Sequence, residues 1–115
     1  MKLTNRHLCK IPDTKLLGYL LAPDHTDGSP KAKFLESFGF SRDRPDELRA
    51  ALIGHASSHD FIASRQTDFG EIFEIVGRLA SPDGRNPFVK VVWMIDTGKR
   101  TPRLVTAVPA RGAKP

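Results

Sequence analysis

The change in hydrophobic period near Asp60 constrains the fold of this chain more than any other feature. Before Asp60 apolar residues recur every three or four positions, as on one face of a helix, and after it they alternate with polar residues. A helical half followed by a strand half predicts an α+β fold, with helices packed on an antiparallel sheet. The 115 residues suffice for one domain with a small core and are too few for two.

Two helices are expected in the first forty residues. Asp13 can cap a helix over about Thr14–Leu21, in which four leucines form one apolar stripe. Ser29 suits the N-cap of a second helix, Pro30–Phe38, and Gly39 suits its end. The apolar faces of both helices are expected to pack toward the core.

A third helix is expected to begin near Pro45. Acidic residues follow in its first turn, where the helix dipole favours them, and Gly54 and the Ser57-Ser58 pair close it. Its inward side chains are Leu48, Ala51, Leu52 and His55. The N-terminal half is therefore interpreted as three helices.

Four strands are expected after Asp60. They cover Phe61–Gln66, Glu71–Ala80, Phe88–Asp96 and Arg103–Val108. Short turns join them, so consecutive strands should pair antiparallel in a meander. We thus expect residues 1–115 to form one α+β domain, three N-terminal helices packed on a four-stranded antiparallel sheet. Its core covers about residues 13–109, and a loose basic tail covers residues 110–115.

The positive charge of the chain is concentrated at its two ends. The net charge is +5, and residues 1–33 and 85–115 carry most of the excess of lysine and arginine. If the fold brings the ends together, they form a face suited to a polyanion such as nucleic acid. The single cysteine excludes internal disulfides and four-cysteine zinc sites. With no long apolar stretch, a cytoplasmic protein, or a module of a larger one, is expected.

The start of the second helix collects groups suited to phosphate. Lys31 and Lys33 lie in its first turn, where the positive end of the helix dipole makes a cation cost about 0.3–1 kcal/mol. An anion should offset this cost. Asp24 or Asp27 is one candidate, and a phosphate held by the free backbone N–H groups of the helix is the other.

Short motifs follow one another from about Lys15 to Pro109. They are KLLGYLL, HTDGSPKAKFLESFGF, DELRAAL, a DFG turn, a PDGR hairpin, VVWMID and PRLVTAVP. In this order they resemble an uncharacterised family of small bacterial domains, found alone and at the C-terminal ends of polymorphic and contact-dependent growth-inhibition toxins. The wider group resembles the barnase, EndoU, colicin and RelE class of ribonucleases, which cleave RNA without a metal or cofactor.

The resemblance also implies a set of site residues. The pattern His-x-x-Gly-x-x-Lys-Ala is matched by His25, Gly28, Lys31 and Ala32, and the closing Arg-Leu-x-Thr by Arg103, Leu104 and Thr106. The implied catalytic set is His25, Lys31, Arg103 and Thr106, and the implied phosphate-binding set is Gly28, Ser29 and Lys33. RNA and a cognate antitoxin or immunity protein are the implied partners, with no metal, no cofactor and no membrane.

These residue types suit the chemistry. Metal-free RNA cleavage needs a base for the 2′-hydroxyl, a cation for the charge that develops on the phosphate, and an acid for the leaving 5′-oxygen. His25 suits proton transfer because an unperturbed histidine has a pKa near 6.5. Lys31 and Arg103 would bind the phosphate, and Thr106 would hydrogen-bond it.

Each site residue also has a purely structural interpretation. His25 can be a solvated loop residue, and Arg103 can pair with Asp96 across a hairpin. Thr106 can be an ordinary strand residue, and Trp93 belongs in the core more often than on a base-stacking surface. The alternative function is therefore a non-catalytic binding module, either antitoxin or immunity-type, or one that docks nucleic acid or protein.

Other clusters give weaker signals. His55 and His59 stand four residues apart, but the helix is expected to end there, so a metal site is disfavoured. Cys9 has His7 nearby in sequence, yet nothing orients the pair as a nucleophile and base.

Overall fold

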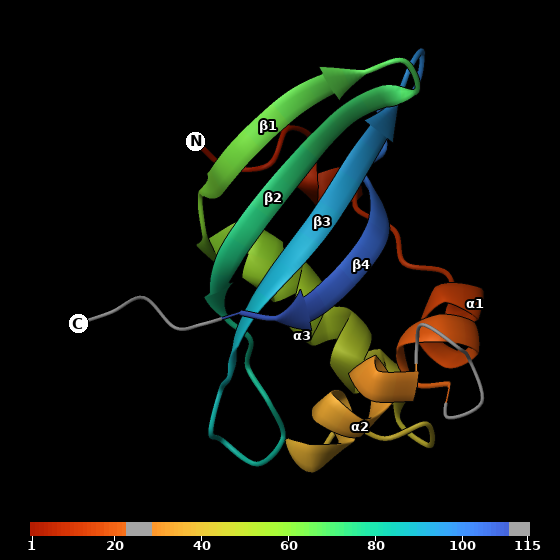
Figure 1. Ribbon diagram of the computed structural model, residues 1–115, viewed down its shortest axis with the longest axis vertical. Helices are drawn as coiled ribbons and strands as arrows, with labels where there is room; N and C mark the ends of the chain where they lie inside the picture. The colour runs from red at the N-terminus through yellow and green to blue at the C-terminus, as the bar shows by residue number, and fades with distance from the viewer. Residues whose placement is uncertain (23–28, 111–115) are drawn as a thin grey trace.

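The computed structural model describes residues 1–22 and 29–110 (Figure 1). The helical segments are η1 (Arg6–Leu8), α1 (Asp13–Lys15), η2 (Leu16–Leu20), α2 (Ser29–Ser37) and α3 (Pro45–Ser58). The strands are β1 (Phe61–Thr67), β2 (Gly70–Arg78), β3 (Phe88–Asp96) and β4 (Arg103–Pro109). This order confirms the predicted α+β class, with helices preceding the strands.

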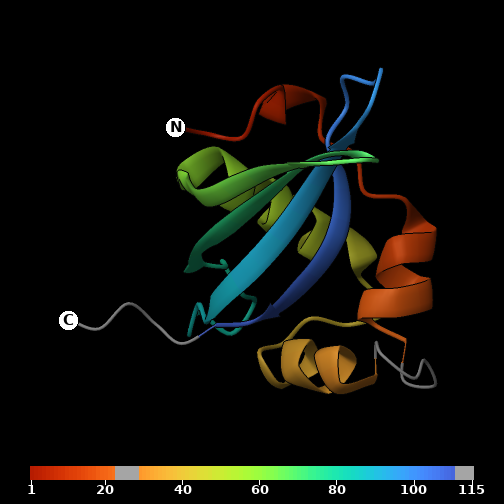
Figure 2. The same cartoon turned by 45° about the horizontal axis from the view of Figure 1, so that its top comes forward.

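The strands form one antiparallel sheet in the order β1-β2-β3-β4, which confirms the meander. The β2–β3 ladder is unbroken from Gly70 opposite Asp96 to Arg78 opposite Phe88. In Figure 1 the sheet lies in front of α3, and its nearer face carries no helix of the described chain. Figure 2, in which the top of the molecule is tilted toward the viewer, shows α2 below the sheet.

The β3–β4 pairing contains a bulge at Val105. Val92 pairs with Thr106, but the next residue, Trp93, pairs with Leu104, so Val105 is an extra residue in β4. A bulge bends its strand and redirects neighbouring side chains, and bulges are common beside functional sites. β4 is also an edge strand, and on its outer side Lys10 of the N-terminal segment forms an isolated parallel bridge with Arg103.

The first predicted helix begins differently from the expectation. The helix starts at Asp13, with Pro12 in the N-cap position and no side-chain cap, so the prediction that Asp13 caps it was wrong. The carboxylate of Asp13 instead pairs with the guanidinium of Arg49 on α3. The acidic residue is thus used to tie two helical segments together.

The same segment does not continue as a regular α-helix. From Leu16 the turn widens into a π-helix, η2, and the N–H of Leu21 donates to the carbonyl of Leu16 at 2.8 Å. Leu16, Leu20 and Leu21 are all fully buried, whereas Leu17 is only partly buried. The π-helical turn thus accompanies the burial of three leucines within about one and a half turns.

The other two helices lie close to their predicted positions, although α2 begins at Ser29, which was predicted to be its N-cap, and ends at Ser37. Gly39, at φ 100°, follows the end of α2 as expected, because glycine tolerates this left-handed conformation. α3 starts at Pro45 and buries Leu48, Leu52, His55 and Ala56. No described helix has both the length and the apolar character that a bilayer crossing requires.

The core lies between α3 and the covered face of the sheet. Trp93 in the middle of β3 is fully buried beside Phe73 of β2, its cross-strand partner. The N-terminal segment also contributes, because Leu3 and Ile11 are buried in the same cluster. The core therefore includes residues ahead of residue 13, where the sequence placed its start.

Candidate functional site

The structure describes five of the seven predicted site residues. His25 and Gly28 lie outside the described residues. Ser29 opens α2, Lys31 and Lys33 follow in its first turn, and Arg103 and Thr106 belong to β4. Lys33 is exposed, whereas Lys31 and Thr106 are partly buried.

Tyr19 of η2 connects Lys31 with Thr106. The Tyr19 hydroxyl lies 3.0 Å from Oγ1 of Thr106, within hydrogen-bond distance. The ammonium nitrogen of Lys31 lies 5.3 Å from the centroid of the Tyr19 ring, in a cation–π contact. One aromatic side chain thus joins a predicted site residue of α2 to one of β4.

Lys15 of α1 completes this group. Its Nζ lies 4.9 Å from the centroid of the same Tyr19 ring and donates to the backbone carbonyl of the bulged Val105 at 3.3 Å. Within the described parts of the chain, no carboxylate forms an ion pair with Lys15. We call Lys15, Tyr19, Lys31 and Thr106 the Tyr19 cluster, and all four are partly buried.

Arg103 lies at the start of β4 and is already paired. Its Nε donates to Oδ2 of Asp96 at 2.7 Å, and its Nη2 donates to Oδ1 of Asp96 at 3.1 Å and contacts Sδ of Met94 at 3.2 Å. This hydrogen bonding lowers the pKa of Asp96 and raises the pKa of Arg103. Arg103 precedes Thr106 by three strand residues, about 10 Å along β4.

Trp93 and His55 are buried, and His59 is partly buried next to His55. Trp93 is fully buried, in agreement with its core interpretation. Nε2 of His55 donates to the carbonyl of Gly77 at 3.2 Å, and Nδ1 of His59 donates to the carbonyl of His55 at 2.9 Å. The His59 ring lies so close to Gly77 that a Cβ there would be 2.4 Å from it.

His55 is an uncharged core residue. Its second nitrogen, Nδ1, is buried and has no partner among the described atoms. Burial lowers the pKa of His55 to about 4, and the nearby His59 adds to this effect. Across residues 1–22 and 29–110, no three His, Cys, Asp or Glu side chains gather in a geometry that could hold a metal ion.

Cys9 is a free, partly buried thiol. It lines an apolar hollow of about 550 Å³ with Ile11, Arg49 and Ile53 among its neighbours. Burial raises the pKa of Cys9 to about 11, so the thiol is protonated at neutral pH. The absence of an activated thiolate argues against a role as nucleophile.

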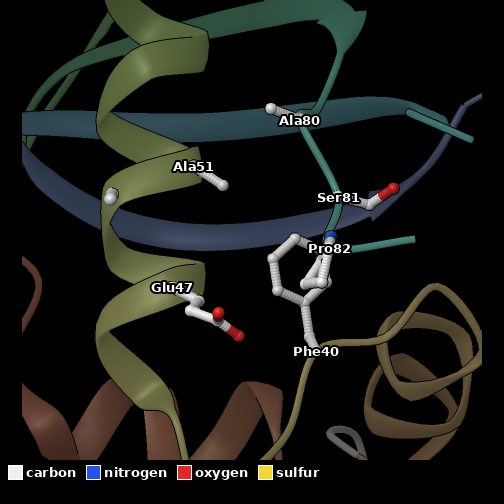
Figure 3. A pocket seen from close by; sticks show the side chains of 7 residues that line it. Phe40, Glu47, Ala51, Ala80, Ser81 and Pro82 are labelled. Atoms are coloured by element: carbon white, nitrogen blue, oxygen red, sulfur yellow. The ribbon is translucent and has the colours of Figure 1, made fainter. Parts of the chain in front are cut away.

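A further hollow of about 350 Å³ lies between α3 and the segment that follows β2. Figure 3 shows Phe40 and Pro82 side by side at this hollow, with Glu47 and Ala51 reaching toward it from α3. Glu47 is the one ionisable residue among those that line it. None of the predicted site residues belongs to it, so we do not assign the site here.

Sequence reasoning did not single out Lys15 and Tyr19. Their four-residue spacing, which puts two side chains on one face of a helix, is visible in KLLGYLL. Their contacts with Val105 and Thr106, however, span most of the chain and depend on the packing of η2 against the edge of β4. Only the spacing was available from the sequence.

The fold is shared with a solved structure. A chain of a contact-dependent growth inhibition toxin–immunity protein complex from Klebsiella pneumoniae 342 superposes with a TM-score of 0.70, covering 87% of this chain and 98% of that chain. The two chains are 12% identical, so the similarity establishes a common fold. No curated protein matches the sequence. The family model described as a domain of unknown function, DUF6883, matches residues 2–111, and the chain belongs to this family.

Proposed function

We propose that this domain is a metal-independent, ribonuclease-like toxin domain that acts on RNA. The observation that carries the proposal is the Tyr19 cluster, in which Lys31 and Thr106 meet on one tyrosine although they come from α2 and β4. The fold shared with a chain of a toxin–immunity complex supports a toxin or immunity-related role. The resemblance to metal-free ribonucleases supplies the reaction.

The reaction needs few groups. The 2′-hydroxyl gives its proton to a base, its oxygen bonds to phosphorus, the bond from phosphorus to the 5′-oxygen breaks, and that oxygen takes a proton. In this proposal His25 transfers protons, an assignment that rests on the sequence alone. Lys31 stabilises the negative charge that develops on the phosphate, and Thr106 hydrogen-bonds the phosphate.

The remaining predicted residues take supporting places. Gly28 and Ser29 bring the phosphate to the start of α2, where backbone N–H groups favour anions. Lys33, exposed on the same helix, adds long-range attraction for RNA. We assign Arg103 to the β3–β4 hairpin, because phosphate binding would require it to release Asp96.

A non-catalytic binding module is the second candidate. The solved complex contains a toxin and an immunity protein, so similarity to one of its chains fits either role. As a toxin, the domain would act in the cytoplasm of a target cell and would be neutralised by a cognate immunity protein. As an immunity-type module, it would bind such a toxin and cleave nothing.

The deciding experiment is a cleavage assay in chelator. Purified wild-type protein is incubated with transfer, ribosomal and messenger RNA, beside the His25→Ala variant and with 2′-O-methyl RNA as a control substrate. We expect the wild type to cleave RNA and to leave 2′-O-methyl RNA intact, because the attacking hydroxyl is blocked. Loss of a general acid or base should slow the His25→Ala variant by about 10²–10⁴-fold.

Two results would contradict the proposal that the domain is a ribonuclease. If no RNA is cleaved, the binding-module candidate takes its place. If 2′-O-methyl RNA is cleaved as fast as RNA, the proposed chemistry is wrong. Equal cleavage by wild type and His25→Ala would remove His25 from the site.

A further inference from the structure

Two lysines share one tyrosine ring in the Tyr19 cluster. Nζ of Lys15 lies 4.9 Å and Nζ of Lys31 lies 5.3 Å from the centroid of the Tyr19 ring. Both ammonium groups are therefore restrained by the same side chain. Restraint matters because a lysine otherwise loses side-chain entropy when a ligand fixes it.

The charge of Lys15 is not compensated by any carboxylate in the described part of the chain. Its contacts are the Val105 carbonyl and the Tyr19 ring, which are neutral groups, and no described carboxylate pairs with it. By contrast, Lys2, Arg49, Arg85, Lys90 and Arg103 each pair with an aspartate or glutamate. A partly buried cation with only neutral partners is suited to an anion.

The hydroxyl of Tyr19 connects the Tyr19 cluster to β4 through Thr106. Its contact with Thr106 is 3.0 Å long and lies next to the bulge, whose Val105 carbonyl holds Lys15. The bulge at Val105, Tyr19 and Lys15 therefore restrain one another through these contacts. The ring sets the two ammonium groups, and the hydroxyl sets Thr106 relative to them.

We propose that Lys15 is a second phosphate-binding cation and that Tyr19 is the positioning residue that aligns Lys15, Lys31 and Thr106 for one RNA phosphate. The proposal rests on the proposed function, since it names the groups that bind RNA in that site. The proposal goes beyond that function because neither residue belongs to the catalytic or phosphate-binding set that the resemblance implies. Tyr19 acts through its neighbours rather than on the phosphate.

The test of Lys15 is the salt dependence of RNA binding. A labelled single-stranded 2′-O-methyl RNA, which binds without being cleaved, is titrated with wild type, Lys15→Ala, Lys15→Arg and Lys99→Ala at several salt concentrations. Each lost phosphate contact lowers the slope of log K against log salt by about 0.7 for a single strand. We expect that loss for Lys15→Ala and a wild-type slope for Lys15→Arg. Lys99→Ala removes the same charge from an exposed turn and should keep the slope.

The test of Tyr19 is a double-mutant cycle on the cleavage rate. Tyr19→Phe keeps the ring and loses the hydroxyl, so we expect kcat to fall about 3- to 10-fold, the effect of one hydrogen bond. Thr106→Val should have a similar effect, and the double variant should be no slower than either single variant, because both remove the same contact. Tyr19→Leu, which also removes the ring, should be slower than Tyr19→Phe.

The outcomes separate the inference from the function beneath it. If the wild type neither binds nor cleaves RNA, the proposed function fails and the inference fails with it. If the wild type does both while Lys15→Ala keeps the full salt slope, Lys15 does not bind phosphate. If the effects of Tyr19→Phe and Thr106→Val on kcat multiply in the double variant, as for independent sites, Tyr19 does not position Thr106.

Discussion

Two regions that share β4 treat positive charge in opposite ways. At the start of the strand, Arg103 is held by two hydrogen bonds to Asp96, so its charge is compensated within the hairpin. In the middle of the strand, the Tyr19 cluster brings Lys15 to a carbonyl and an aromatic ring, with no described carboxylate on Lys15. The comparison teaches that the partner of a cation, more than its place in a motif, separates a structural role from a binding role.

The largest expected effect comes from Lys31. Its replacement by alanine removes a cation that the Tyr19 ring holds at the proposed phosphate site, so we expect cleavage to slow by about 10²–10³-fold. The measurement is kcat/KM on whichever RNA the wild type cleaves. Lys33→Ala is the matched control, because it removes the same charge from an exposed position two residues along α2. We expect less than about a threefold change there. Equal effects of the two variants would mean that only the overall charge of α2 matters.

Acid should weaken the fold through His55, away from both regions. The pKa of His55 is about 4 in the folded protein, and its ordinary value is 6.5. Between these two pH values His55 is therefore protonated in the unfolded chain and neutral in the folded protein. Stability is therefore full above about pH 6.5 and falls by roughly 3 kcal/mol on going down to about pH 4. His55 lines a small hollow of its own between α3 and the end of β2. The other ionisable residues that line it, His59 and Arg78, carry no negative charge that would stabilise a protonated His55.

Urea unfolding at a series of pH values measures this effect. His55→Gln lacks the titrating group but keeps an N–H donor for the Gly77 carbonyl, so its stability should change less over this interval. His59→Gln should keep most of the wild-type pH dependence. An unchanged pH dependence in His55→Gln would show that other groups cause the acid sensitivity. Cleavage assays that compare the two regions of β4 belong above pH 6.5 for the same reason.

A smaller effect is expected at the hairpin. Arg103→Gln and Asp96→Asn each break the pair, and both should lower the melting temperature slightly, because the pair is solvent-exposed. Each should keep cleavage within about tenfold of wild type, since an exposed structural pair contributes little to a distant site. If Arg103→Gln loses as much activity as Lys31→Ala, then Arg103 binds phosphate and the contrast between the two regions disappears.

The smallest effect is expected for Cys9. With a pKa of about 11 against an ordinary 9.0, its thiolate fraction at neutral pH is about 100-fold below that of a free thiol. We expect slow alkylation by iodoacetamide in the folded protein and unchanged cleavage by Cys9→Ser. Inactivation by alkylation that Cys9→Ser prevents would instead place a functional group in the hollow beside Arg49.

The sequence predicted the sheet better than the first helix. The change to a period of two predicted the strands, and in β2 Phe73 is buried whereas its neighbours Ile72 and Glu74 are only partly buried. The π-turn of η2 was not predictable, since leucines at 16, 20 and 21 are compatible with an α-helix as well. In the structure all three are buried and the turn is π-helical.

The site shows the same division. The motifs predicted Lys31 and Thr106 as site residues, and both contact the Tyr19 side chain. They also predicted Arg103, which pairs with Asp96, its alternative structural partner in the sequence analysis. The bulge at Val105 was not predictable, because nothing in RLVTAV marks an extra residue. Because the bulge was not predicted, the contact between Lys15 and the Val105 carbonyl of β4 could not be predicted either.

The most direct test is a crystal structure of His25→Ala bound to an RNA substrate that carries a 2′-deoxy nucleotide at the cleaved position. The account predicts a phosphate within hydrogen-bond distance of Nζ of both Lys15 and Lys31 and of Oγ1 of Thr106, with Arg103 still paired to Asp96. A phosphate bound to Arg103 in place of Asp96, with none at the Tyr19 cluster, would contradict it.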